Sequence, residues 1–420
     1  MKSDVAIIDV GRTMFGEHYE IEPQKLIEEA FLDASKRSGI ERKNLEACFL
    51  STYFLPQTNK IGAPEGFVSY VMGTHVPMET SRSFSSAFSN AYNAIVSGRH
   101  KLILVGGVEK MTDRLSKVRD DLMILEDPLS FYAGATPETN HELMLREYIR
   151  KYDIHDKSLE ELKIALAQMS VKNHKNALKN ENAQFRKGKE ISVDTVLSAR
   201  KKKSLGTFDF APISDGAATV LLASSKIAEQ YTDNPVYVFG LGSATDYISH
   251  QARDERSGFL STQLAMENAL KMAKLERKQI ELLEIYDQST VTGMISFEDL
   301  GFAEKGKVWN DIYKSCECGK EHYEINGRQL FVNTNGGLKA DGNPLGATGG
   351  AQIYEVFKQL RGEAKERQVK EKINYGIVSE IEGFGIKSVC SKTDSIKSNP
   401  GSGSRKKRGW WFERSRCNRY

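Results

Sequence analysis

The chain has 420 residues, 40% of them hydrophobic and 27% charged, which is the composition of a globular protein with one large domain or two ordinary ones. Its formal net charge is +3, but residues 401–420 hold seven Lys/Arg and one Glu, a net +6, so residues 1–400 carry about −3. A nearly neutral body gives no support for a nucleic-acid-binding surface.

Cysteine content and hydropathy argue against a disulfide-rich protein and against a membrane-spanning one. The cysteines are few and scattered, which argues against a disulfide framework and favours a reducing compartment: Cys48, Cys316, Cys318, Cys390 and Cys417. The first residues lead directly into the apolar run 5–10 rather than into a signal-like segment, and no apolar run approaches the ~20 residues that span a bilayer. We therefore expect a cytoplasmic protein without a membrane partner.

Short β-rich apolar runs alternate with helical segments, which indicates an α/β fold with a parallel sheet and crossover helices. In chain order, the pattern predicts a strand at 5–10, an amphipathic helix over 23–38, a strand at 47–51, a helix over 83–97 and a buried strand at 102–107. Further helices are expected over 138–148, over 259–274 and from about Ala351 onward, the last one preceded by a glycine-rich loop.

An internal repeat is visible in the sequence. Residues 40–50 and 275–285 both combine a helix exit, a charged Glu-Arg-Lys turn and a buried strand. Because the offset covers more than half of the chain, the repeat indicates a duplicated domain rather than a solenoid.

The predicted boundaries follow from the repeat. Residues 1–230 form a first half, which contains a charged, helix-rich insertion over 113–205, and residues 235–392 form a second half. Residues 393–420 begin with a Gly/Ser-rich stretch and continue as a basic segment, which we interpret as a flexible tail rather than a binding tail.

Four segments, in order, resemble motifs of the thiolase superfamily, and the resemblance covers about residues 4–392. They are Leu104–Thr112 (LVGGVEKMT), Ser214–Ala218 (SDGAA), Ile285–Thr290 (IYDQST) and Asn335–Gly349 (NGGLKADGNPLGATG). The closest similarity is to archaeal and sterol-carrier-type members. The resemblance implies a duplicated βαβαβαββ thiolase fold of five layers, αβαβα, with an inserted loop domain in the first half.

The residues that should carry thiolase chemistry are replaced. The resemblance implies a cysteine nucleophile at a helix N-terminus, activating histidines and a second cysteine. The corresponding positions hold Ser81, Tyr286, Asn343 and Glu380, and Glu382 stands where a glycine is usual. Because a serine hydroxyl is far less acidic than a thiol, ordinary thiolysis is not expected.

Three functions stay open at this stage. The first is an acyl-CoA-binding enzyme with altered chemistry, which either transfers an acyl group through Ser81 or performs aldol-type C–C cleavage of a CoA thioester. In the second reaction, Tyr286 and Asn343 would hold the thioester oxygen while Glu380 or Glu382 moves a proton, with Asp287 as the next candidate acid. The second function is a non-catalytic scaffold subunit of an acyl-CoA-handling complex. The third is a protein that binds nucleic acid or a membrane through its basic tail, and this hypothesis rests on residues 405–420 alone.

Coenzyme A requires cations for its phosphates. The insertion offers Arg186 and Lys187 in one run and Lys201 and Lys202 in another, and the glycine-rich loop offers the N–H of Gly346. No covalently bound cofactor is expected. The resemblance further implies a homodimer or higher homo-oligomer, and it suggests a synthase and a small OB-fold/zinc-ribbon protein as partners.

No metal site is predicted. Cys316, Cys318 and His322 offer only three ligands at an atypical spacing for structural zinc. His141 lies on a predicted helix without a matching partner, and we interpret it as a surface or core histidine.

Overall fold

The computed structural model describes residues 3–201, 203–317 and 321–394. The predicted tail was 393–420; residues 393 and 394 still belong to the last strand, and residues 395–420, Lys202 and residues 318–320 lie outside the described residues. None of the helices in the described ranges is long and apolar enough to cross a bilayer.

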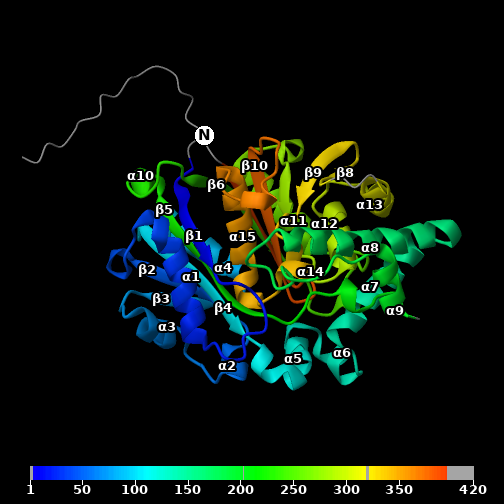
Figure 1. Cartoon of the computed structure of the whole chain (residues 1–420), viewed down its shortest axis with the longest axis horizontal. Coiled ribbons are helices and arrows are strands. Elements are labelled where there is room, and N and C mark those ends of the chain that lie inside the picture. The colour runs from blue at the N-terminus through cyan, green and yellow to red at the C-terminus, as the bar shows by residue number, and fades with distance from the viewer. Residues whose placement is uncertain (1–2, 202, 318–320, 395–420) are drawn as a thin grey trace, which may run out of the picture.

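Each half of the chain builds one half of a single eleven-stranded sheet (Figure 1). In the first half the order is β3-β2-β4-β5-β1, in which β2 runs parallel to β3 and β4, and β5 runs antiparallel to β4 and β1. The bounds are β1 Val5–Arg12, β2 Ala47–Ser51, β3 Met78–Ser81, β4 Leu102–Lys110 and β5 Asp215–Ser224.

The second half repeats this arrangement as β9-β7-β10-β11-β6, with the same parallel and antiparallel pairs, and adds β8 at its edge. The bounds are β6 Val236–Thr245, β7 Leu282–Glu284, β8 Tyr323–Ile325, β9 Arg328–Val332, β10 Tyr375–Glu382 and β11 Lys387–Asp394. The halves join where Ala6 and Ile7 of β1 pair with β6. Both halves therefore follow the predicted order βαβαβαββ.

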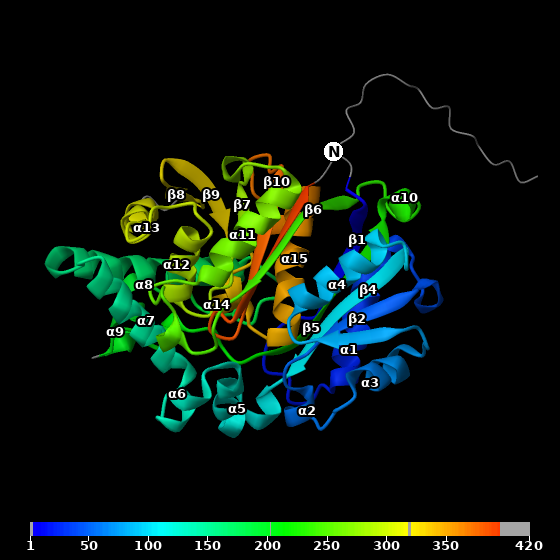
Figure 2. The ribbon, with the colours of Figure 1, turned by 180° about the vertical axis from the view of Figure 1, so that it is seen from behind.

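Helices form layers around the two half-sheets. α1 (Pro23–Ser38) packs on the outer face of the first, and α11 (Leu260–Ala273) packs on the outer face of the second. α4 (Phe84–Val96) and α15 (Leu345–Arg361) contact each other and strands of both halves, so they form the central layer (Figure 2). α15 is almost entirely buried, as a helix between two sheets must be.

The remaining helices lie on the connections. Before the insertion come α2 (Leu55–Thr58) and α3 (Pro64–Met72); after it come α10 (Ser225–Ala228), α12 (Thr290–Asp299), α13 (Val308–Glu317) and α14 (Gly337–Asp341). Between β4 and β5 the described residues form helices but no strand: α5 (Leu115–Leu122), α6 (Pro128–Tyr132), α7 (Pro137–Lys151), α8 (Asp156–Leu178) and α9 (Val193–Arg200).

The duplication predicted from the repeat is confirmed, since the turn at Arg42–Asn44 leads into β2 as the turn at Arg277–Gln279 leads into β7. The predicted start of one helix was wrong. α15 begins at Leu345 rather than near Ala351, so Gly346, Gly349 and Gly350 lie inside its first turns. Helix propensity disfavours glycine there, but the absence of side chains lets Phe84 and Glu380 approach the helix closely.

Candidate active site

Two buried carboxylates hold the loops at the ends of the central strands. Asp215, from the SDGAA segment, accepts hydrogen bonds from the backbone N–H groups of Met111 (2.7 Å) and Thr112 (2.9 Å) and pairs with Lys110 (3.0 Å). It therefore fixes the end of the GGVEKMT segment against the start of β5. The two motifs thus form one structural unit.

Glu109 ties the loop after β2 to the start of α15. Its carboxylate accepts from the N–H groups of Tyr53 (2.9 Å), Phe54 (2.9 Å) and Gly346 (3.0 Å), and from the hydroxyl of Thr52 (2.7 Å). The N–H of Gly346, predicted to serve coenzyme A, is thus engaged by a carboxylate. A Cβ at Gly346 would lie 2.8 Å from the carbonyl oxygen of Ser51, so the glycine permits close packing here.

Glu380 of β10 lies at the N-terminus of α4. Its Oε2 accepts from the backbone N–H of Ser85 at 2.6 Å, and among the described residues Oε1 has no hydrogen-bond partner. Burial raises the pKa of Glu380 to about 7, and this effect outweighs the hydrogen bonds from Ser85 that lower it. A carboxyl group of this kind can accept or release a proton near neutral pH.

Beside it, Glu382 anchors a second hydrogen-bonded group. It accepts from the hydroxyls of Ser83, the N-cap of α4, and Ser86 (2.8 Å), while Lys387 donates to the Ser86 hydroxyl at 2.5 Å. The serine hydroxyls at the helix start thus serve as partners of a carboxylate.

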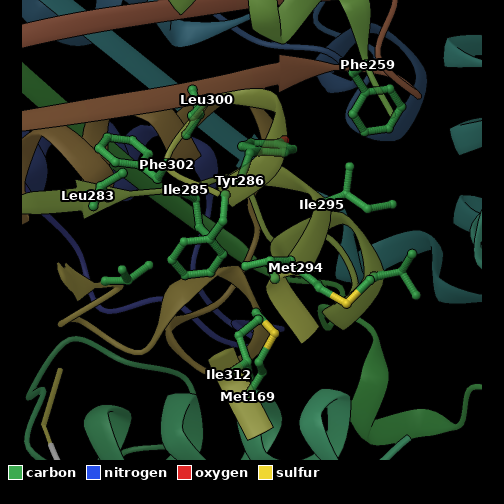
Figure 3. Close-up of a cluster of buried hydrophobic side chains, with 14 of the residues drawn as sticks. Met169, Phe259, Leu283, Ile285, Tyr286, Met294, Ile295, Leu300, Phe302 and Ile312 are labelled. Carbon is green, nitrogen blue, oxygen red and sulfur yellow. The ribbon is translucent and has the colours of Figure 1, made fainter. Parts of the chain in front are cut away.

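Tyr286 follows β7 and is 1% exposed, within the apolar cluster of the second half (Figure 3). Burial, followed by the nearby charge of Glu380, raises its pKa well above 10, while a hydrogen bond from Gln288 opposes this rise. The phenol therefore stays protonated at neutral pH. It can donate a hydrogen bond, but it does not meet the condition of a depressed pKa that action as a base would require.

Asn343 lies between α14 and α15. Its backbone N–H donates to the hydroxyl of Ser214 (2.9 Å), and its Oδ1 accepts from the hydroxyl of Thr348 (2.7 Å). Because Oδ1 is engaged by a donor, the amide NH₂ is the group left to donate to a ligand. Asn343 therefore has the character of an oxyanion-hole donor.

Asp287 connects two segments of the chain through hydrogen bonds. Its carboxylate accepts from the N–H of Leu338 (2.7 Å) and from the amide of Asn173, which joins the glycine-rich segment to α8. Burial raises its pKa to about 7.

Ser81 is not at the helix start. It is the last residue of β3, two positions before the N-cap Ser83, and its hydroxyl accepts from Asn90 at 3.4 Å. The contacts of Glu380 go to Ser85 and those of Glu382 to Ser83 and Ser86, so neither carboxylate activates Ser81.

A pocket of about 200 Å³ is lined by Asn343; we call it the inner pocket. Glu380 and Tyr286 do not line it. Asn343 and Gln288 line it, together with apolar side chains that include Leu345 and Met111. Glu126, Glu138 and His141 come to it from the insertion.

A larger cleft of about 1050 Å³ adjoins the inner pocket; we call it the outer cleft. The two share the lining residues Arg119, Glu138, Phe210, Ala211 and Pro212. Cations line the outer cleft: Arg119, Arg146, Arg200, Lys201, Lys203 and Lys339. Arg200 is committed to Asp209 through two 2.8 Å hydrogen bonds, and Lys339 to the Phe210 carbonyl at 2.6 Å.

Only some of the residues predicted to bind coenzyme A therefore line the outer cleft. Lys201 lines the outer cleft, whereas Arg186 and Lys187 do not, although the preceding Phe185 does. Lys202 lies outside the described residues.

The sequence did not identify Glu126 or His141 as pocket residues. His141 is 4% exposed, and its Nδ1 lies 2.9 Å from the Ser289 hydroxyl. Neither belongs to a recognisable motif, because the insertion reaches the pocket only through tertiary packing.

No cysteine whose side chain the structure describes belongs to this site. Cys48 of β2 and Cys390 of β11 are both buried, and burial raises the pKa of each thiol to about 12. The site instead combines a carboxyl group poised near neutrality, a protonated phenol and an amide donor next to a cation-lined cleft.

Comparison with known proteins identifies the fold's family. The thiolase N-terminal domain model matches residues 5–226, and the thiolase C-terminal domain-like model matches residues 242–391. An acetyl-CoA acetyltransferase of Methanothermobacter thermautotrophicus is 35% identical over 389 residues, which cover 91% of this chain and 97% of the relative. Another, from Methanocaldococcus jannaschii, is 32% identical and covers 91% of this chain and 96% of the relative.

Solved structures agree on the fold. The structure titled "Ltp2-ChsH2(DUF35) aldolase" superposes with a TM-score of 0.77 at 18% identity and covers 94% of this chain and 99% of that one. A monomeric SCP2-thiolase-like protein from Mycobacterium smegmatis superposes with a TM-score of 0.69 at 14% identity, over 93% of this chain and 77% of that one. With the duplicated sheet and both family models matched in order, the chain belongs to the thiolase family.

Proposed function

We propose that the chain binds an acyl-CoA thioester with its coenzyme A portion in the outer cleft and its acyl group in the inner pocket, and that it cleaves or forms a C–C bond by aldol-type chemistry. The observation that carries this proposal is Glu380, a buried carboxyl with a pKa of about 7 at the helix start where the family resemblance implies a thiolate.

The cleavage of a 3-hydroxyacyl thioester proceeds as follows. A base takes the proton of the C3 hydroxyl, the C2–C3 bond breaks, and its electron pair moves into an enolate of the thioester. The C3 fragment leaves as an aldehyde or ketone, and protonation of C2 gives the shortened acyl-CoA. Glu380 is suited to moving the proton, while the amide of Asn343 and the phenol of Tyr286 are suited to donating hydrogen bonds to the enolate oxygen.

This assignment is favoured over acyl transfer through Ser81 because the hydroxyl of Ser81 lacks an activating base among its hydrogen-bond partners. The fold likeness to a structure titled an aldolase is consistent with it. That title also names a DUF35 protein, which supports the proposal that this chain works with a small partner protein. A homodimer remains a prediction.

The test is incubation of the full chain with a 3-hydroxyacyl-CoA, followed by mass spectrometry of the products and of the intact protein. We expect a shortened acyl-CoA and a carbonyl compound in equal amounts, with no covalent adduct. Glu380→Gln should slow the reaction by about 10²–10⁴-fold, the usual size of one acid–base contribution. Tyr286→Phe should slow it by about 10²–10³-fold, the usual cost of losing one hydrogen-bond donor to the oxyanion, whereas Ser81→Ala should not slow it.

The other outcomes have definite meanings. An acyl adduct on the protein that disappears in Ser81→Ala would replace the proposal with acyl transfer. Tight thioester binding with neither cleavage nor adduct would leave the scaffold function.

A further inference from the structure

The inner pocket contains two glutamates in opposite electrostatic settings. Glu138 stands in the first turn of α7 and pairs with Arg119 at 2.6 Å. Although burial opposes ionisation, hydrogen bonds from its own backbone N–H and from Thr136, with Arg119, lower its pKa. Glu138 is therefore ionised at neutral pH.

Glu126 has no such cation. It ends the turn Met123–Leu125, is 8% exposed, and its Oε2 accepts from the side-chain amide of Asn140 at 2.8 Å. Arg253, the nearby cation, donates instead to the carbonyl of Tyr247 at 2.9 and 2.6 Å. Burial raises the pKa of Glu126 to about 8, so its carboxyl is mostly neutral at pH 7 and offers both an O–H donor and an acceptor.

Apart from the Arg119–Glu138 ion pair, the other polar groups of the inner pocket are uncharged. Burial lowers the pKa of His141 to about 4, which leaves a neutral imidazole, and Gln288 and Asn343 contribute amides. An aliphatic acyl chain would leave the amide NH₂ of Asn343 without a partner, at a cost of about 1–3 kcal/mol. Because Arg119 and Glu138 pair with each other at 2.6 Å, the pocket offers an ionised acyl group no uncompensated charge. The ligand that suits these groups best is an acyl group that carries an uncharged oxygen.

We propose that Glu126 is the specificity-determining residue of the inner pocket, where its carboxyl group receives an uncharged hydroxyl or keto oxygen carried by the acyl group beyond the thioester carbonyl. The inference rests on the proposed function, because it assumes that the acyl group of a CoA thioester enters this pocket.

The test compares the dissociation constants of the full chain for 3-hydroxybutyryl-CoA and butyryl-CoA, measured by calorimetry. Every protein in this test carries Glu380→Gln, which prevents cleavage of the hydroxylated thioester during the titration, so wild type refers here to position 126. The two probes differ by one hydroxyl. We expect wild type to bind the hydroxylated thioester at least tenfold more tightly, since a site that hydrogen-bonds a hydroxyl rejects an analogue without it. Glu126→Leu should abolish this preference and keep the affinity for butyryl-CoA.

Two variants control the comparison. Glu126→Gln keeps a neutral donor and acceptor of the same shape and should retain the preference. Glu138→Gln changes the other glutamate of the same pocket and should retain it too. Thermal unfolding of each variant shows that the fold is kept.

The failures are distinguishable. Equal affinities in wild type, or a preference that survives Glu126→Leu, would overturn the role of Glu126 while leaving thioester binding in place. Absence of binding to either thioester would overturn the proposed function itself, and this inference with it.

Discussion

At the scale of single residues, the site has exchanged a soft nucleophile for groups that hold or move protons. By the family resemblance, Glu380, Tyr286 and Asn343 are expected to stand at positions on which thiolase chemistry depends, and Glu109 and Asp215 hold the surrounding loops in place. Burial raises the pKa of Glu380 to about 7, and carboxyl groups with pKa values perturbed in this way are typical of functional sites. The combination favours altered chemistry over lost chemistry.

The cysteines give a direct test at this scale. Because burial raises the pKa of Cys48 and Cys390 to about 12, the thiolate fraction of each is negligible at pH 8. Iodoacetamide should leave both unmodified in the native protein, as measured by peptide mapping, and should label both after unfolding in urea. Rapid native labelling of either one would contradict the burial described here.

At the scale of elements, the start of α15 depends on close packing rather than on helix propensity. A Cβ at Gly346 would lie 2.8 Å from the Ser51 carbonyl and 3.0 Å from Glu109 Oε2, both of them parts of fixed structure. Gly346→Ala should therefore destabilise the protein by about 1–3 kcal/mol and weaken thioester binding, as measured by urea unfolding and calorimetry.

Gly66 in α3 is the matched control, since a Cβ there meets nothing within 4 Å. Gly66→Ala should stabilise the helix by about 0.5–1 kcal/mol. If both substitutions had the same sign, packing at Gly346 would not be what fixes this element.

The same elements explain what the sequence could and could not reveal. The repeated turn and strand were visible because they are local, and they led correctly to the duplicated fold. The start of α15 was missed because glycine opposes a helix locally and only the packed neighbours Phe84 and Glu380 favour one. The family resemblance placed the nucleophile position at Ser81, but a resemblance between motifs does not give the residue at which the helix begins; the N-cap is Ser83. Glu126 and His141 belong to no motif, so only tertiary packing brings them to the inner pocket.

At the scale of the whole molecule, many titratable groups are buried in their neutral forms. Burial raises the pKa of several acids, among them Glu126 (about 8), Asp287 (about 7), Glu380 (about 7) and Asp299 (about 6), and it raises that of Glu284 well above its ordinary value. It lowers the pKa of three histidines, His141, His174 and His250, to about 4. Between pH 4 and 6.5 the histidines make stability rise with pH, because the unfolded chain binds more protons there, and the acids oppose this trend.

Above pH 6.5 the histidines of the unfolded chain lose their remaining protons, so the contribution of the acids becomes the larger one. The folded chain then holds protons that the unfolded chain has lost, so stability must fall as pH rises. This lasts until about pH 8, where the lowered pKa of buried Lys339 begins to act in the opposite direction.

We therefore expect the free energy of unfolding, measured in urea, to fall between pH 6.5 and 7.5 by roughly 2 kcal/mol per pH unit. Glu126→Gln should make this slope less steep by about 1 kcal/mol per pH unit, since Glu126 keeps most of one proton across this range in the folded protein. Glu304→Gln, at a fully exposed position, should leave the slope unchanged. A flat or rising stability over this range would mean that these carboxyls are ionised in the folded protein, and Glu380 would then lack the proton affinity that its role as a base requires.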